Sequence, residues 1–552
     1  MAETDVSGIA TAWRVFILLI QVTAILAVFA AFFVFRRAKD HDLFARVLLA
    51  VLPFGAVGTL ASLAYGVIRH YGNWWSANRL AKLVGMAAGY ELYPLPGTGR
   101  IDCNMYGPIA ELVYAPALLV GTPVEMLGVG MFVSMLLFFV PGVLVIRQAS
   151  KDRVSVAAAF AAIVVFLMYT AHNGPLSYVA YLIHADAPAV GLILLAVYFL
   201  SRANGSDRVR YAAISGALAG LAPFAKQNVV FAGLALCLYV AVTMDRRHGA
   251  AFLVGFLAAA TAGVVLIASA FSIEGFAYNA IVRPGGHGFV GSLATTLRTT
   301  PFIRFVPFVV PLLFVFLLWP GRTWRERLKN GDIEAQLIAV FLFMTPISIA
   351  GRAKIGGDVN AFALGVTALV LFALLTILRA SIVRTDGYDN RIIRKYGHVV
   401  RNAAVLTLAL FTVYLAGYFV VKIQSPTTRT IVSGLHNTPE RVAYAYLSDH
   451  NESVYLPVNR LSQVVIDGKL YHSAYDVWET EQTEGPVDAA RFFAGAPESP
   501  DVITIPKGAA NWKETPTILR FYPDYVVSND TTGDAYWIEY RPRAVVDSIR
   551  AE

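Results

Sequence analysis

Two ionisable residues stand directly before an apolar run in YLIHADAPAVGLILLAVYFL, which covers residues 181–200. An ionised side chain near the centre of a membrane helix costs about 2.5–3.5 kcal/mol, so such residues usually face water and serve a function. His184 and Asp186, facing an aqueous cavity, could bind a sugar hydroxyl, a phosphate or a metal ion. The alternative is that Asp186 caps a helix with Pro188 in its first turn, but a cap does not require the histidine.

A second set of polar residues lies in the long segment 69–123. Asp102 follows a stretch of glycine and proline typical of a turn, and Glu111 lies one helical turn after Pro108. Both carboxylates are candidates for a general base, because a base must reach the hydroxyl that it deprotonates. The alternatives are a plain turn residue for Asp102 and a solvent-facing helix residue for Glu111.

Three shorter clusters combine cations with amides or glycines. In GLAPFAKQNVVFAG the polar residues predict a tight turn between two short helices, where the lysine either snorkels to the interface or contacts a phosphate. In RAKIGGDVNAF the paired glycines would let backbone N–H groups approach an anion, although a connecting turn could use the same residues. RPGGHG lies in a loop of about 30 residues, long enough for a mobile lid. The candidate binding residues are Lys226, Gln227, Asn228, Arg283, His287, Lys354, Asp358 and Asn360.

Together these clusters supply carboxylates, cations and amides at the ends of apolar segments. Such a mixture suits a transfer reaction whose donor is a lipid phosphate. The lipid tail would lie between helices, and cations would neutralise the phosphate as it leaves. A carboxylate, from Asp102 or Asp186, would take the proton from the attacking hydroxyl. His184 and Glu111 are expected to bind substrate.

The composition indicates that membrane helices position these residues. Of the 552 residues 57% are hydrophobic and 15% are charged, against about 25% charged residues in soluble domains. The net charge of +8 does not indicate nucleic-acid binding, because the basic residues lie between apolar segments, where the positive-inside rule accounts for them. With only Cys103 and Cys237 present, no disulfide framework is expected.

Apolar segments of about 20 residues predict a polytopic, mainly α-helical bundle of about twelve spans. The segments are 13–35, 43–68, 124–146, 154–171, 186–201, 210–224, 229–243, 250–271, 304–319, 336–350, 360–378 and 402–421. Lysine and arginine are concentrated in alternate connections, which the positive-inside rule assigns to the cytoplasm. Segment 69–123 and the chain after residue 421 are then expected to face outward. This requires residues 106–120 to lie along the interface and not to cross.

The chain after residue 421 changes character, so two domains are expected: a membrane domain over 1–421 and a small external α/β domain over 422–552. SVYLPV, DVITIP and AYWIEY are typical of strands. TPERVAYAYLSDH predicts a helix with Thr438 at its N-cap and Glu440 in its first turn.

Segment 69–123 also contains a helical pattern. Apolar residues from Leu80 to Ala87 recur at helical spacing, opposite Arg79 and Lys82. This predicts an amphipathic helix on the membrane surface. The tryptophan pair directly before it would anchor the helix in the interface.

Four stretches, taken in this order, resemble the GT-C class of integral-membrane glycosyltransferases. They are RLAKLVGMAAGYELYPLPGTGRIDCNMYGPIAELVYAPALL, HADAPAVGLILLA, GALAGLAPFAKQ and KIGGDVNAF. The resemblance covers about residues 40–380 and is greatest to the bacterial branch related to protein mannosyltransferases, arabinosyltransferases and lipopolysaccharide-modifying sugar transferases. One departure is NWWSANR, because many relatives have an acidic residue just before the amphipathic helix.

The resemblance implies a polyprenyl-phosphate sugar donor and an envelope glycan, lipid or protein acceptor. Transfer would be inverting, on the periplasmic side of a bacterial inner membrane, and a divalent metal such as Mg or Mn would be a candidate cofactor. The roles of base and second acid fall on Asp102 and Asp186. The contact with the lipid phosphate falls on Lys226 or Lys354.

Two other classes of function remain open from the sequence. A transporter or flippase of lipid-linked glycan would need charges at mid-helix and similar halves, and few such charges and no repeat are found. A membrane scaffold with an external binding domain would need no converging polar groups. An enzyme requires Asp102 and Asp186 to meet at one cavity, which separates it from both alternatives.

Overall fold

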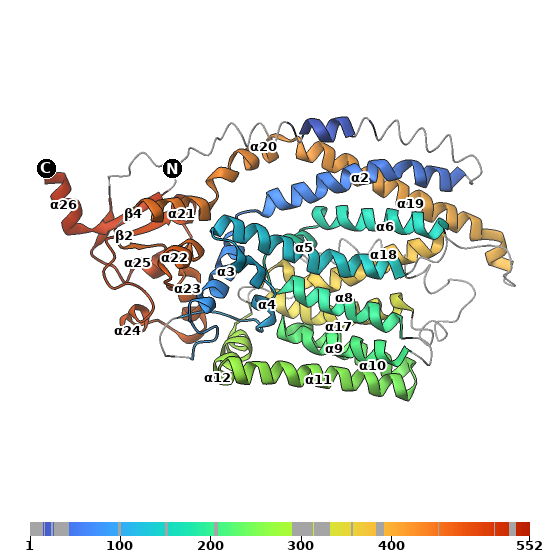
Figure 1. The fold of residues 1–552 in the computed structure, drawn as a ribbon, viewed down its shortest axis with the longest axis horizontal. Coiled ribbons are helices and arrows are strands. Elements are labelled where there is room, and N and C mark those ends of the chain that lie inside the picture. Colours follow the sequence, from blue (N-terminus) through green and yellow to red (C-terminus); the bar gives the residue numbers. More distant parts are fainter. Residues whose placement is uncertain are drawn as a thin grey trace.

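The computed structural model describes residues 15, 17–23, 26, 43–95, 97, 101–148, 153–203, 208–289, 313, 332–354, 357–381, 391–450, 452–512, 514–528 and 537–551. The long helices lie side by side along the long axis of the molecule, and a smaller mixed region occupies one end (Figure 1). Most of the predicted helices at 304–319 and 13–35 and residues 290–303 of the predicted lid loop lie outside the described residues.

A helix is found at each predicted span that the structure describes. The long apolar helices are α2 (Leu43–His70), α5 (Pro123–Gln148), α6 (Arg153–His172), α11 (Arg246–Ala270), α17 (Ile333–Ala353), α18 (Ala363–Ser381) and α19 (Arg391–Ile423), and the shorter ones are α8 (Asp186–Ser201), α9 (Val209–Leu221) and α10 (Val230–Thr243). Among the described residues, six helices are long and apolar enough to cross a membrane, or seven if α6 and α7 (Gly174–Tyr181) form one bent span. The predicted positions are thus confirmed, but the count of about twelve is not.

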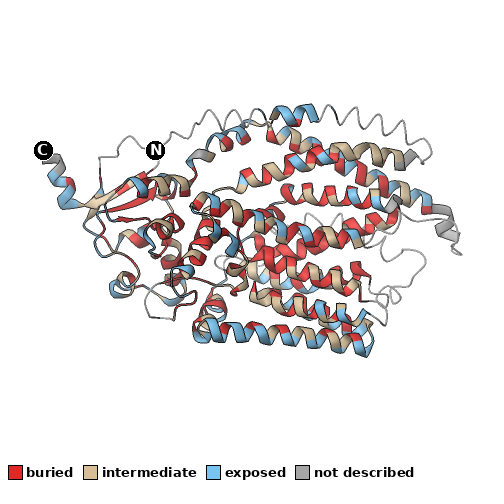
Figure 2. Ribbon diagram, in the orientation of Figure 1, coloured by how far each residue is buried: buried red, intermediate tan, exposed pale blue. Residues whose placement is uncertain are grey.

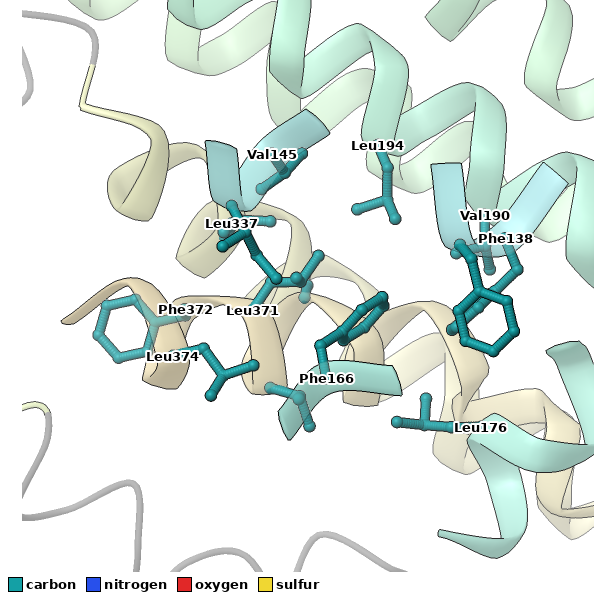
Figure 3. Packing of buried hydrophobic residues seen from close by; sticks show 14 of the residues in the cluster. Phe138, Val145, Phe166, Leu176, Val190, Leu194, Leu337, Leu371, Phe372 and Leu374 are labelled. Atoms are coloured by element: carbon teal, nitrogen blue, oxygen red, sulfur yellow. The ribbon is translucent and has the colours of Figure 1, made fainter. Parts of the chain in front are cut away.

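The core of the bundle is built around α18. In its apolar window 89% of the residues are buried, against 22% in α11, whose leucines and valines face outward as expected for a helix in contact with lipid. Figure 2 shows the same contrast between a buried centre and an exposed edge. Phe138, Phe166, Leu194 and Leu371 pack together from four different helices (Figure 3). Close packing of this kind fixes the ends of the helices, where the polar clusters lie.

Short helices connect the spans. They are α3 (Trp74–Ala87), α4 (Ile109–Leu112), η1 (Ala115–Leu119), η3 (Ala222–Phe224), η4 (Gln227–Val229), α12 (Ile273–Ala277), η5 (Tyr278–Val282), α13 (Arg283–Gly286) and η6 (Val359–Phe362). Residues 106–120 contain only α4 and η1, which are too short to span a bilayer, as predicted. The turn predicted at residues 226–228 is also found between α9 and α10, where η3, Lys226 and η4 reverse the chain.

Helix α3 is where the sequence predicts it, but it is not a surface helix. Both its apolar residues and its cations are buried, including Arg79 and Lys82. The rings of Trp74 and Trp75 stack on each other at 4.0 Å, and that of Trp75 packs on Tyr475 at 4.5 Å. The rings thus contact the C-terminal region (residues 426–551), while their role as an anchor in the membrane interface stays a prediction.

The C-terminal region contains a four-stranded sheet in the order β1-β2-β4-β3. Its strands are β1 (Val454–Tyr455), β2 (Val502–Pro506), β3 (Tyr525–Val527) and β4 (Trp537–Pro542); β1 is parallel to β2, and β4 is antiparallel to both neighbours, with Thr504 opposite Glu539. The three predicted strands are found, and β3 was not predicted. The helices are α20 (Pro426–Ser433), η7 (Leu435–Asn437), α21 (Pro439–Asp449), α22 (Arg460–Asp467), α23 (Ala474–Glu484), α24 (Ala489–Phe493), η8 (Lys507–Ala509), α25 (Thr515–Leu519) and α26 (Arg543–Ala551). Helix α21 has Thr438 at its N-cap, as predicted.

Gly107 allows segment 69–123 to approach the end of α9. A Cβ atom at this position would lie 2.1 Å from the carbonyl oxygen of Phe224. We expect Gly107→Ala to lower the free energy of unfolding by about 1–3 kcal/mol, because the backbone must move to admit the methyl group. Thermal unfolding of the purified chain in detergent measures this. Gly121→Ala, at a site with no atom within 4 Å, should have little effect, and equal stability of the two variants would contradict the prediction.

Candidate active site

A cavity of about 200 Å³ lies where segment 69–123, α7, the residues just before α8, the turn after η3, α13 and the connection from α17 through η6 meet α23. Each of these elements contributes lining residues, and the walls carry three cationic side chains, two imidazoles and four other aromatic rings. The lining residues are Trp75, Arg79, Met105, Tyr106, Tyr178, His184, Lys226, Asn228, Pro284, His287, Gly351, Lys354, Gly357, Asp358, Asn360, Ala361 and Tyr475. Seven of the predicted site residues are therefore brought together: His184, Lys226, Asn228, His287, Lys354, Asp358 and Asn360.

Asp186 lies directly behind this wall and holds several lining residues in place. Its Oδ1 accepts a hydrogen bond from Lys226 Nζ at 2.5 Å. Its Oδ2 lies 2.5 Å from His184 Nδ1 and accepts from Asn360 Nδ2 at 2.9 Å. Asp186 is the first residue of α8, but no described helix-capping bond uses its side chain. Both oxygens instead connect residues of three separate segments, so the capping interpretation does not describe its contacts.

His184 is a neutral imidazole at neutral pH. Burial lowers its pKa to about 4, although Asp186 acts in the opposite direction. Its backbone N–H donates to Tyr114 Oη at 3.2 Å, and its carbonyl accepts from the same hydroxyl at 2.9 Å. A neutral ring with its proton on Nδ1, toward Asp186, presents Nε2 as an acceptor 3.5 Å from Tyr106 Oη. This arrangement of carboxylate, imidazole and cavity is suited to proton abstraction.

Three cations face the cavity. Burial alone would lower the pKa of Lys226, but Asp186 outweighs it and raises the pKa, so the amine is an ammonium ion. Arg79 stacks over the Tyr106 ring at 4.2 Å, and its Nη1 lies 3.4 Å from Glu111 Oε1. Lys354 Nζ donates to the carbonyl of Pro284 at 3.0 Å. The cavity can therefore hold an anion such as a phosphate.

Glu111 lies one layer behind Arg79 and does not line the cavity. It is 1% exposed, and burial raises its pKa while Arg79 acts against this. A solvent-facing helix residue is therefore not what the structure shows. The carboxylate compensates the charge of Arg79 and so orients a cation that does face the cavity.

Asp102 lies in a separate ion cluster. It is 2% exposed; Lys82 Nζ lies 2.8 Å from its Oδ1, and Arg460 Nη2 lies 3.4 Å from its Oδ2. Arg460 Nη1 also pairs with Asp476 Oδ2 at 2.6 Å. The two acids that the sequence places in catalysis thus do not meet at one cavity, and the expectation that they would is not met. The stretch that follows Asp102 reaches the cavity through Met105 and Tyr106. The case for an active site therefore rests on Asp186 and its partners.

Gln227 and Arg283 support the walls without lining them. Gln227 Nε2 donates to the carbonyls of Met105 and Ala280, both at 2.9 Å. Arg283 Nη1 donates to the carbonyl of Asp102 at 3.1 Å, and its other nitrogens pair with Glu484. Arg283 thus bonds to the backbone of Asp102 and to Glu484, and it does not line the cavity in which an anion would bind.

Several functional residues were not predicted as such. Arg79 was assigned to a solvated helix face, and Tyr106, Tyr178 and Tyr475 carried no signal. An isolated tyrosine does not indicate a cavity wall, since Tyr475 reaches the cavity from α23, about 300 residues after Tyr178 in the sequence.

A magnesium or manganese ion does not fit at Asp186. Both of its carboxylate oxygens are taken up by N–H donors, one of them the ammonium group of Lys226. Hard divalent cations need free oxygen ligands and would have to displace this ammonium ion.

A second cavity, of about 470 Å³, opens at the end of α11. It is lined by residues 89–93 and 269–272 together with Met86, and the only ionisable side chains among its lining residues are Glu91 and two tyrosines. It therefore lacks the converging cations and imidazoles of the first cavity.

No known protein-family model matches the chain, and no curated protein sequence matches it significantly. Among solved structures, ArnT from Cupriavidus metallidurans bound to undecaprenyl phosphate aligns with a TM-score of 0.51 and 14% identity, over 89% of this chain and 97% of that chain. Apo ArnT gives 0.50 and 15%, over 90% and 98%. The Archaeoglobus fulgidus oligosaccharyltransferase in complex with Zn and sulfate gives 0.42 and 11%, over 89% and 73%. The chain therefore has the fold of ArnT, and the predicted GT-C fold is confirmed.

Proposed function

We propose that this protein is a membrane glycosyltransferase that moves a sugar from a polyprenyl-phosphate donor to a hydroxyl group of an envelope glycan, lipid or protein. The observation that carries the proposal is the single buried carboxylate of Asp186, which holds Lys226, His184 and Asn360 at one cavity. A cation for a phosphate and a base for a hydroxyl thereby lie side by side. The fold of ArnT, which was crystallised with undecaprenyl phosphate, supports a donor of this class.

The location follows from the distribution of basic residues. We place the membrane domain, residues 1–421, in a bacterial inner membrane. The cavity and the domain over 422–552 then lie on the periplasmic side. Membrane lipid then surrounds the outward-facing apolar surface of α11, and the polyprenyl tail enters between helices.

The reaction needs one base and neutralisation of the leaving phosphate. His184 Nε2 takes the proton from the acceptor hydroxyl, and Asp186 stabilises the imidazolium ion that forms. The hydroxyl oxygen bonds to the anomeric carbon from the side opposite the phosphate, so the configuration inverts. The bond between the anomeric carbon and the phosphate oxygen breaks, and its electron pair leaves with the phosphate. Lys226, Arg79 and Lys354 stabilise the negative charge on that phosphate.

Asp102 has a different role in this proposal. Its carboxylate is compensated by Lys82 and Arg460 and has no place on the cavity wall. We assign it to positioning of the stretch that carries Met105 and Tyr106, and not to proton transfer.

The direct test is to incubate membranes containing the protein with a panel of radiolabelled polyprenyl-phosphate sugars. We expect one labelled sugar to move to a membrane or periplasmic acceptor, and no movement in membranes that contain the Asp186→Asn variant. Equal transfer by the variant, or no transfer of any label by the wild type, would contradict the proposal.

Lys354 offers a test of donor binding that leaves the Asp186 cluster intact. Lys354→Met is expected to raise the KM for the donor by roughly tenfold and to leave the KM for the acceptor unchanged, because a hydrogen bond to a charged group contributes about 1.5 kcal/mol or more. Initial rates at varied donor concentration measure this. Lys507→Met, at an exposed site of the C-terminal region, is the control. A change in the acceptor KM alone would place Lys354 at the acceptor.

A further inference from the structure

The four tyrosine and tryptophan rings that line the cavity form two pairs. Tyr106 and Tyr178 both lie edge-on to His184, with ring centroids 5.2 and 5.9 Å from that of the imidazole. Trp75 of α3 and Tyr475 of α23 contact each other instead, with centroids 4.5 Å apart and ring planes at 78°. The first pair therefore borders the proposed base, whereas the second pair joins segment 69–123 to the C-terminal region.

Further aromatic rings hold the Trp75–Tyr475 pair in place. Trp74 stacks on Trp75 at 4.0 Å and lies 6.0 Å from Tyr475, and Trp512 packs on Trp74 at 5.2 Å. Trp74 and Trp512 are not among the lining residues of the cavity, but Trp75 and Tyr475 are, and both remain partly exposed. The pair thus presents ring surface in a fixed orientation, which lowers the entropy cost of binding a ligand there.

The lining residues Tyr475 and Asn228 also carry polar groups that no described hydrogen bond uses. Burial and the nearby Glu479 raise the pKa of Tyr475, so its hydroxyl group keeps its proton and can donate. Within the described part of the chain, no hydrogen bond involves this hydroxyl or the side-chain amide of Asn228, whose Oδ1 is buried. A buried polar group without a partner is unfavourable, so a ligand that bonds to the amide is favoured.

This combination of groups fits the ring of a sugar. One face of a sugar ring consists largely of C–H groups, which pack on aromatic rings, and its rim carries hydroxyl groups that need hydrogen-bond partners. The cavity volume of about 200 Å³ is below the range of about 300–1,000 Å³ for drug-sized ligands, so it suits a single ring.

The position of the ring follows from the donor. The anomeric carbon of a polyprenyl-phosphate sugar is bonded to the phosphate, so the ring must lie beside the cations that bind this phosphate. His184 faces the acceptor hydroxyl in the proposed reaction. Trp75, Tyr475 and Asn228 are then the aromatic and amide groups of the wall that are left for the ring.

We propose that Trp75 and Tyr475 bind the ring of the donor sugar and that Asn228 bonds to one of its hydroxyl groups. This sugar site rests on the proposed function, and through Tyr475 it makes the C-terminal region part of the donor site. The cations bind the lipid phosphate, and the aromatic pair and the amide add affinity only when the lipid carries a sugar.

The test compares the same lipid with and without a sugar. Undecaprenyl phosphate and a panel of undecaprenyl-phosphate sugars are titrated into the full-length protein in detergent, without an acceptor. We expect at least one sugar to increase the affinity by about tenfold over undecaprenyl phosphate. Tyr475→Ala should abolish this gain and leave the affinity for undecaprenyl phosphate unchanged. Tyr475→Phe should keep most of the gain, because it keeps the ring.

Two further variants separate contact with the sugar from a loosened structure. Trp512→Leu removes a ring from the same aromatic group without touching the cavity, and it should keep the gain. Asn228→Ala should reduce the gain by roughly threefold or more, as for the loss of one hydrogen bond. Binding of undecaprenyl phosphate with wild-type affinity shows that a variant is folded around the cavity.

The sugar site is overturned if no sugar adds affinity in the wild type, if folded Tyr475→Ala keeps the gain, or if Trp512→Leu loses as much. Should Tyr475→Ala no longer bind undecaprenyl phosphate, a full gain in Asn228→Ala overturns it. If the wild type binds neither undecaprenyl phosphate nor any of its sugars, the proposed function fails as well. The two failures can therefore be told apart.

Discussion

The Asp186→Asn variant is expected to lose sugar transfer by on the order of 10³-fold, within the range found when a general base loses its function. An asparagine can accept from Lys226 or from Asn360, but it carries no charge to stabilise a His184 imidazolium ion. It also presents an N–H group where the present carboxylate accepts, at Oδ1 or at Oδ2. Rates are measured with saturating donor and acceptor, so that a loss of affinity does not enter.

Stability must be separated from chemistry in this experiment. Asp186→Asn leaves the ammonium group of Lys226 buried and uncompensated, which costs about 3–5 kcal/mol in comparable buried pairs. The double variant Asp186→Asn with Lys226→Met removes both charges and should regain most of the stability. It should not regain activity. Asp547→Asn, at an exposed site of α26, controls for the exchange of an aspartate in general.

Full activity of Asp186→Asn would end the proposal that this cluster carries the reaction. Recovery of activity in the double variant would show that the single variant failed through instability alone. Either result would make Asp358 the next candidate, because it is exposed and is the one carboxylate among the lining residues of the cavity.

The positions of the membrane helices could be predicted from the sequence because they depend on a local property, the length of each apolar stretch. An apolar stretch must be helical in a bilayer, where backbone groups have no water partner, and its length sets the ends. The number of helices that cross the membrane could not be predicted in this way. Helix α8 and helix α10 are apolar but short, and α6 and α7 meet at a bend of 95°, so tertiary packing decides whether they cross.

Part of the site was also accessible, for the same reason. His184, Lys226 and Asn360 stand at the ends of apolar segments, and the alternation of basic and less basic connections puts these particular ends on the same side. Asp102 could not be placed, because its contacts depend on Arg460, a residue 358 positions later in the chain. The burial of α3 was missed for the same reason, since α22 covers it from the C-terminal region and Arg460 Nη1 donates to Asn78 of α3 at 2.9 Å.

Arg460→Met is expected to lower the free energy of unfolding by about 3–5 kcal/mol, which is the second large effect. The guanidinium group is 2% exposed and pairs with Asp102 and Asp476. Methionine fills much of the space but carries no charge. Of the cations described in this cluster, Lys82 alone would then remain to balance Asp102 and Asp476. Thermal unfolding of the full-length protein in detergent measures the loss. Arg543→Met, at an exposed site of α26, should change stability by less than about 0.5 kcal/mol.

A double variant tests whether the loss arises from the ion cluster. Asp102→Asn combined with Arg460→Met should cost less than the sum of the two single variants, because each one removes the partner of the other. Strict additivity would show that the two residues act separately and would contradict the positioning role of Asp102. In that role, the folded fraction of Asp102→Asn keeps most of its kcat, while its stability falls. A loss of kcat without a loss of stability would restore Asp102 as a candidate base.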